Sequence, residues 1–152
     1  MVGAPNAAVA LQNIAMSPVV VIAEGYATAA TLAEHGKVPT LAAYDSGNLL
    51  SVATSIRERW PEKAIVIAGD DDHRLENNPG REKALAAAEA VAGNAIFPNF
   101  SAEQQSRGLT DFNDLGAQNP ELVSQQLTCT KTFETRLIGL SLAADNDLAI
   151  SY

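Results

Sequence analysis

The stretch VVVIAEGYATAATL, residues 19–32, decides the fold of this chain. Its first five residues, Val19–Ala23, are all apolar and mostly β-branched, as is typical of a strand that is covered on both faces. Glu24 and Gly25 follow at once, and a helical pattern then runs over Ala27–His35 and ends at a glycine. The stretch predicts a buried strand that turns directly into a helix, with a carboxylate at the carboxyl end of the strand.

The same alternation of strand and helix continues along the chain. Further strands are predicted at Val38–Ala43, Ala64–Ala68 and Ala95–Phe97. Further helices are predicted at Leu49–Trp60, Asn78–Gly93 and 119–127, and a polar loop at Asn99–Gly108. This order predicts an open, mainly parallel α/β sheet of about four strands flanked by helices, with right-handed crossovers. Ligands of such sheets bind beyond the carboxyl ends of the strands.

The composition indicates one globular domain with two short flanking segments. The chain has 152 residues, of which 47% are hydrophobic and 18% charged, which is ordinary for a folded domain. We interpret residues 1–18 as an Ala-rich leader that forms a short helix or lies over the core. Residues 19–127 form the α/β domain, and 128–152 a C-terminal extension with one more helix around Phe133–Ala143.

Cysteine usage and hydropathy favour a cytoplasmic protein without membrane contact. Cys129 is the single cysteine, which excludes an internal disulfide and a multi-cysteine zinc site and fits a reducing compartment. No apolar run approaches the roughly 18 residues of a membrane span. The first residues contain no Lys or Arg, so a secretory signal peptide is not expected.

The net charge of −8 argues against direct binding of nucleic acid by Lys and Arg. An exception is a site in which carboxylates hold divalent cations and the cations bind the phosphates.

Acidic residues follow three of the predicted segments. Glu24 follows the first strand, Asp70, Asp71 and Asp72 follow the third, and Asp111 and Asp114 come after the fourth strand and its loop. Parallel strands place all of these at one edge of the sheet. Residues two apart in an extended segment point the same way, so we expect Asp70 and Asp72 to face one cation and Asp71 to face elsewhere. Crowded carboxylates need a counter-charge, and oxygen ligands without Cys or His spacing favour Mg²⁺ or Mn²⁺. Glu24 is a further ligand or a general acid or base.

Ordinary structural roles compete with these assignments. A single Asp after a strand is usually a turn or cap residue, which applies separately to Asp45, Asp111 and Asp114. Asp71 is expected to be solvated, and Tyr26 to pack over the first turn. Surface positions are expected for His35, His73, Arg81 and Lys83. The Glu24, Asp70 and Asp72 combination is much harder to explain by turn chemistry.

Several nucleotide-binding and signalling classes do not fit. Receiver domains carry an acidic pair after the first strand and one Asp after the third, the reverse of this order. The segment EGYATA (residues 24–29) is not G-x-G-x-x-G, and a P-loop and a nucleophile elbow are absent from the sequence.

The acidic pattern resembles the Toprim domain, a metal-dependent catalytic module of primases, topoisomerases, some nucleases and recombination proteins. In that family a Glu follows the first strand and Asp-x-Asp the third, matched here by Glu24, Asp70 and Asp72. The likeness is greatest to primases of plasmids and phages and covers roughly Val19–Leu127. It is carried by EGYATAATL (24–32), DSGNL (45–49), IAGDDDH (67–73), NPGREKA (78–84) and TDFNDL (110–115).

The resemblance implies synthesis of short RNA primers on a single-stranded DNA template from nucleoside triphosphates. Asp70 and Asp72 would be metal ligands and Glu24 a ligand or general base, while Asp111 and Asp114 match later acidic positions of the same site. Asn48 would lie behind the site or contact the nucleotide.

The chain lacks the cysteines and the basic surface that accompany such a core in primases. We therefore expect the catalytic core of a longer replication protein, or a reduced stand-alone Toprim protein. A Toprim nuclease, which needs only the acids and the metal, is the alternative enzyme. A non-catalytic module that binds metal, nucleotide or a partner is the alternative outside enzymes.

Overall fold

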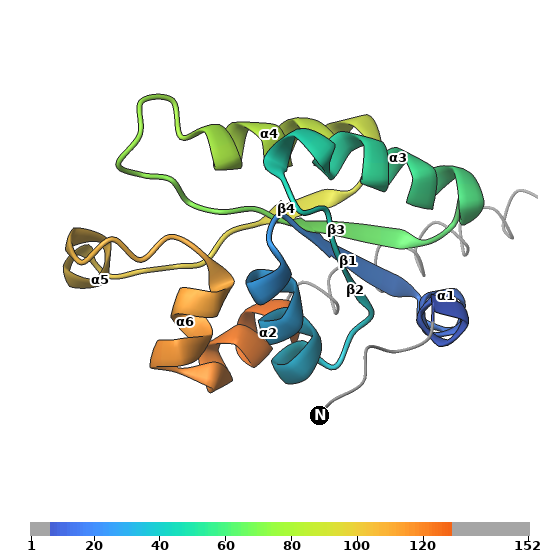
Figure 1. The fold of residues 1–152 in the computed structure, drawn as a ribbon, viewed down its shortest axis with the longest axis horizontal. Helices are drawn as coiled ribbons and strands as arrows, with labels where there is room; N and C mark the ends of the chain where they lie inside the picture. Colours follow the sequence, from blue (N-terminus) through green and yellow to red (C-terminus); the bar gives the residue numbers. More distant parts are fainter. Residues whose placement is uncertain (1–6, 129–152) are drawn as a thin grey trace, which may run out of the picture.

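The protein folds around a four-stranded parallel sheet with strand order β2-β1-β3-β4 (Figure 1). The computed structural model describes residues 7–128. The strands are β1 (Val19–Ala23), β2 (Thr40–Ala42), β3 (Ala64–Ala68) and β4 (Asn94–Ile96). The central strands β1 and β3 pair in register, Ala23 opposite Ala68, and every residue of both is buried. Their continuous apolar sequence thus corresponds to a strand pair covered on both faces, as predicted.

Helices cover both faces of the sheet (Figure 1). On one face, Val19 and Val21 pack in a core with α2 (Tyr26–Gly36), α6 (Phe112–Gln118) and the helical residues 120–128. The opposite face, with Val20 and Ile22, is covered by the following elements: α3 (Leu49–Arg59), α4 (Pro79–Ala90) and Ile14 of α1 (Ala7–Met16). Alternate residues of one strand therefore serve two separate cores, as in other doubly covered sheets.

The predicted elements are largely confirmed, except that one strand is shorter than predicted and two short helices were not predicted. The strand predicted at Val38–Ala43 is limited to β2 (Thr40–Ala42). The helix predicted at 119–127 is present from residue 120. The predicted loop Asn99–Gly108 contains a short helix, α5 (Ala102–Ser106), and α6 was not predicted. Both begin with a capping box, which supplies hydrogen bonds to the first turn of a helix too short to be seen from hydrophobic periodicity.

The flanking segments are described only in part. Residues 7–16 form α1, and its Ile14 is 2% exposed and packs in the core. The helix predicted around residues 133–143 lies outside the described residues. Within residues 7–128, no helix is both long and apolar enough to cross a membrane.

Candidate metal centre at the carboxyl edge of the sheet

The carboxyl edge of the sheet brings the predicted acidic residues within electrostatic range of one another. Glu24 leaves β1 directly after Ala23, and Asp70 follows Ala68 of the paired strand by two residues. The charges that act on Asp70 are those of Glu24, Asp111, Asp72 and Asp114. The other four predicted carboxylates therefore lie near enough to Asp70 to repel its charge.

Among these carboxylates, Asp70 has the most strongly raised pKa. Burial, followed by the repulsion of Glu24 and the other carboxylates, raises its pKa to about 7. Its Oδ1 atom is buried and has no hydrogen-bond partner. An ionised, buried carboxylate without a partner is costly, so this oxygen requires a proton or a cation.

Glu24 is in a similar position on the neighbouring strand. Burial first, and then Asp72, raises the pKa of its carboxyl group, and a hydrogen bond from Ser46 partly offsets this. Its Oε2 atom is buried without a partner. The positive charge of Lys83 lowers the pKa of Glu24, and Lys83 donates a hydrogen bond to Ser46 Oγ at 2.9 Å. Lys83 was predicted to be solvated, and its contact with Ser46 was not predicted, since the two residues lie 37 positions apart in the sequence.

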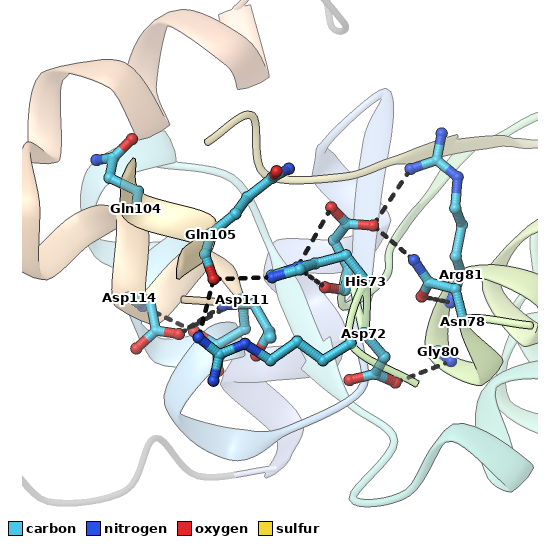
Figure 2. Close-up of polar contacts among 12 residues, drawn as sticks. Asp72, His73, Asn78, Gly80, Arg81, Gln104, Gln105, Asp111 and Asp114 are labelled. Atoms are coloured by element: carbon cyan, nitrogen blue, oxygen red, sulfur yellow. Dashed lines mark hydrogen bonds and ion pairs between the residues drawn. The ribbon is translucent and has the colours of Figure 1, made fainter. Parts of the chain in front are cut away.

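Asp72 is held at the N-terminus of α4 (Figure 2). Its Oδ2 atom accepts a hydrogen bond from the Gly80 backbone N–H at 3.0 Å, where the helix dipole favours a negative charge. A Cβ atom at position 80 would lie 2.8 Å from the same oxygen, so a glycine is needed for this approach. The NPGREKA segment therefore has a local structural role as an anchor for Asp72.

Asp71 points to different partners, as the predicted alternation of the aspartates requires. Its Oδ1 atom accepts a hydrogen bond from Asn78 Nδ2 at 2.7 Å and lies 3.8 Å from a guanidinium nitrogen of Arg81 (Figure 2). The prediction that Asp71 is solvated was wrong, whereas Arg81 lies at the surface as predicted, with 48% of its side chain exposed. The Asp71 side chain is 15% exposed, and the Arg81 guanidinium also lies 4.1 Å from the centre of the Phe97 ring.

His73 fastens the acidic loop to α5. One ring nitrogen lies 2.9 Å from the Asp71 carbonyl oxygen and the other 3.1 Å from that of Gln105 (Figure 2). The side chain is 20% exposed, so the prediction of a plain surface histidine was wrong. The Asp71 N–H also donates to the Thr110 carbonyl at 2.7 Å. The loop that carries Asp70 and Asp72 is thus tied to both later segments.

Asp111 and Asp114 form the capping box of α6. The Asp111 side chain accepts from the Asp114 N–H at 2.7 Å, and Asp114 Oδ2 accepts from the Thr110 N–H at 2.8 Å. The ordinary cap role is therefore real, and it coexists with proximity to Asp70. Burial raises the pKa of Asp111, against hydrogen bonds from the Asp114 N–H and from the buried Thr28.

The remaining predicted positions have structural roles or are exposed. Asp45 caps the 3₁₀ helix η1 (Ser46–Asn48) by accepting from the Gly47 N–H at 2.7 Å. Asn48 donates from Nδ2 to the Ala43 carbonyl at 3.0 Å, which ties η1 to the end of β2. Tyr26 does not pack over the first turn as predicted, since 68% of it is exposed.

The donor set fits a divalent cation in its chemistry, although the ligands are not drawn together. Within residues 7–128, no three Asp, Glu, His or Cys side chains are grouped closely enough to enclose a metal ion. The buried, unpartnered oxygens of Glu24 and Asp70 nevertheless call for a positive charge, and carboxylates are ligands that Mg²⁺ and Mn²⁺ prefer. Binding would require the side chains to converge.

Comparison with known proteins agrees with the geometry. The sequence profile of the Toprim domain matches residues 19–120. The chain is 44% identical over 140 residues to an Escherichia coli DNA primase TraC, covering 89% of the chain and 9% of the relative. A second E. coli DNA primase TraC is 53% identical over 95 residues, covering 60% of the chain and 9% of the relative. The chain thus spans about a tenth of the length of these relatives. No solved structure matches.

Proposed function

We propose, for a chain that belongs to the Toprim domain family, that these residues are the metal-dependent catalytic core of a plasmid- or phage-type DNA primase. The observation that carries the proposal is the pair of buried, unpartnered oxygens, Glu24 Oε2 and Asp70 Oδ1, at the carboxyl edge of the sheet. Identity to the TraC primases supports the reaction class.

Each acidic residue has a role in this proposal. Glu24, Asp70 and Asp72 would hold Mg²⁺ or Mn²⁺, with Asp111 and Asp114 completing the acidic surroundings. When bound, the metal would supply neutralisation of triphosphate charge and polarisation of the attacking hydroxyl. Glu24, whose pKa is raised by burial, is suited to holding a proton of the primer 3′ hydroxyl.

In this proposal the template-binding surface lies outside these 152 residues, because the chain is acidic. A single-stranded DNA template carries one phosphate per nucleotide, and a chain with net charge −8 repels it unless cations intervene. The relatives are about ten times longer, which leaves room for basic and zinc-binding domains. We therefore propose further domains of a larger replication protein as partners.

Calorimetric titration with Mg²⁺ and Mn²⁺, with and without a nucleoside triphosphate, tests the proposal. We expect metal-dependent triphosphate binding that is lost in the Asp70→Asn, Asp72→Asn double variant. Asp71→Asn is the matched control, since it alters the same loop but leaves Oδ1 to accept from Asn78. Absence of metal binding in the unaltered chain would contradict catalysis by this chain.

A primer assay with the longer protein separates the enzyme classes. Formation of labelled short RNA on a single-stranded template, lost in the same double variant, is the expected result. Metal-dependent shortening of the DNA without primer formation would instead identify a Toprim nuclease.

A further inference from the structure

Two tyrosines at the carboxyl edge are exposed although the other described aromatic residues are not. Tyr26 is 68% and Tyr44 76% exposed. The remaining aromatic residues within 7–128 are buried or half-buried: Trp60, Phe97, Phe100 and Phe112. An exposed tyrosine ring presents an apolar face that is available to a ligand.

Both tyrosines lie beside the acidic residues. Tyr26 follows Glu24 by two residues at the start of α2. Tyr44 follows Ala43, whose N–H donates to the Ala23 carbonyl at 2.8 Å, so the β2 and β1 ends lie side by side here. The next residues fold back on the site, because Ser46 hydrogen-bonds Glu24. Both residues therefore lie in the chain next to the edge at which phosphates would bind.

The backbone of Tyr44 is held in an unfavourable conformation. Its φ of 66° lies in the left-handed region, which glycine and asparagine adopt readily and a bulky residue rarely does. The ring gains little packing in return, because it is 76% exposed. Strain at an exposed residue next to a reactive site is more often connected with function than with stability.

We propose that Tyr44, together with Tyr26, forms a stacking surface for a nucleobase whose phosphates are bound at the acidic edge. The proposal rests on the proposed function, because it assigns a base contact to the same site. The edge carries five carboxylates and repels phosphates unless a cation is present, so the base is the part of a nucleotide that the chain itself can attract. Aromatic side chains stack on any base, independent of sequence. Tyrosine at an exposed position offers such a face with few rotatable bonds.

The first test compares a fluorescent single-stranded oligonucleotide with an abasic strand of the same length, in Mg²⁺, on the 152-residue chain. We expect the base-containing strand to bind more tightly. Tyr44→Asn should weaken it by roughly 10-fold and leave the abasic strand unchanged, in line with the usual effect of removing a stacked aromatic. Tyr44→Phe should retain binding, since the ring is kept.

Two controls test whether weaker binding by Tyr44→Asn results from unfolding or from the loss of any exposed apolar side chain. Asparagine tolerates the left-handed backbone, so Tyr44→Asn should unfold at the same temperature as the unaltered chain or higher. Met16→Ala, which removes an 81% exposed apolar side chain just before β1, should leave both strands' binding unchanged. If neither the base-containing strand nor a nucleoside triphosphate binds, or if both bind Tyr44→Asn as tightly as they bind the unaltered chain, the proposal is overturned.

A second arm identifies the source of the base and separates this proposal from the proposed function. A nucleoside triphosphate replaces the strand as probe, and the probe that loses more affinity in Tyr44→Asn supplies the stacked base. In the Asp70→Asn, Asp72→Asn double variant, Mg²⁺ should no longer increase the affinity for the probe. The preference for base-containing strands over abasic strands should remain. Failure of the metal site thus removes the enhancement alone, whereas failure of the stacking surface removes the base preference alone.

Discussion

The two edges of the sheet treat buried charge in opposite ways. At the amino edge, Lys63 is 8% exposed and donates its ammonium hydrogens to the carbonyl oxygens of Ser17 and Ala15. At the carboxyl edge, Glu24 and Asp70 each bury an oxygen that has no partner. The amino edge thus uses charge to complete the fold, while the carboxyl edge leaves charge available for a ligand. This contrast within one sheet supports the proposal that the charge at the carboxyl edge serves a ligand, without reference to any relative.

Arg57 shows the structural use of charge most fully. Its guanidinium bridges the ends of α3 and α4 and the turn before β3, donating to several carbonyl oxygens. These belong to Pro61 at 2.6 Å, Lys63 at 2.7 Å, Val91 at 2.8 Å and Ala92 at 3.4 Å. Carbonyls at the ends of helices have no partner within the helix, so this side chain satisfies groups that would otherwise depend on water.

The largest loss of stability is expected from removal of the Arg57 side chain. Arg57→Ala should lower the free energy of unfolding by about 3 kcal/mol, since several charge-assisted hydrogen bonds to partly buried carbonyls are lost. Arg59→Ala is the matched control, two residues away, and its guanidinium lies 5.1 Å from the Trp60 ring centre. That variant should change stability by less than about 1 kcal/mol. Urea unfolding measures both, and equal losses would refute the special role of Arg57.

Asp70 should behave in the opposite way to Arg57. Its folded pKa of about 7 exceeds the ordinary 3.8, so the folded chain binds the proton more tightly than the unfolded chain. The resulting stability is present below pH 4 and is lost as the pH rises through 7. Asp70→Asn should therefore stabilise the metal-free chain at pH 8 by about 1–2 kcal/mol, after allowance for partial solvent screening.

Urea unfolding at pH 4 and pH 8 measures this gain, which should be absent at the lower pH. Addition of Mg²⁺ should stabilise the unaltered chain and leave Asp70→Asn unchanged, because binding to the folded state alone stabilises it. A variant that is less stable than the unaltered chain at pH 8 would show that the Asp70 carboxylate is a structural group after all.

The fold was more predictable from sequence than the connections around the site. The apolar runs of β1 and β3 depend only on burial of both faces, so local sequence was sufficient. Contacts such as His73 with Gln105 span 32 residues and leave no local pattern. The α6 helix was not predicted, although a cap role was expected for Asp111 and Asp114 taken separately, because seven residues are too few to show a helical hydrophobic pattern. The exposure of Tyr26 depends on tertiary structure that the sequence does not display.

Affinity for Mg²⁺ should depend on pH through Asp70. Protons compete with the metal for this carboxylate below its pKa of about 7, so affinity should fall by up to about tenfold per pH unit from there downward. Above pH 8 the affinity should level off. Calorimetry between pH 5 and 8.5, with Asp71→Asn as the control, measures the profile. A flat profile across this range would show that Asp70 is not a ligand whose proton is displaced.

The smallest effect is expected at His73, which tests whether carboxylates alone hold the ion. Both ring nitrogens contact backbone carbonyls, those of Asp71 and Gln105, and so the ring is occupied in fastening the loop to α5. His73→Ala should lower the free energy of unfolding by about 0.5–1 kcal/mol, the usual range for a net hydrogen bond at a partly exposed site. Mg²⁺ affinity should stay within about twofold, since the Asp72 side chain keeps its own anchor on the Gly80 N–H. If calorimetry instead shows a loss of affinity as large as that of Asp70→Asn, the imidazole is a ligand. In that case His73, like Lys63 at the amino edge, would be a polar side chain that stabilises the fold, and it would also bind the metal ion.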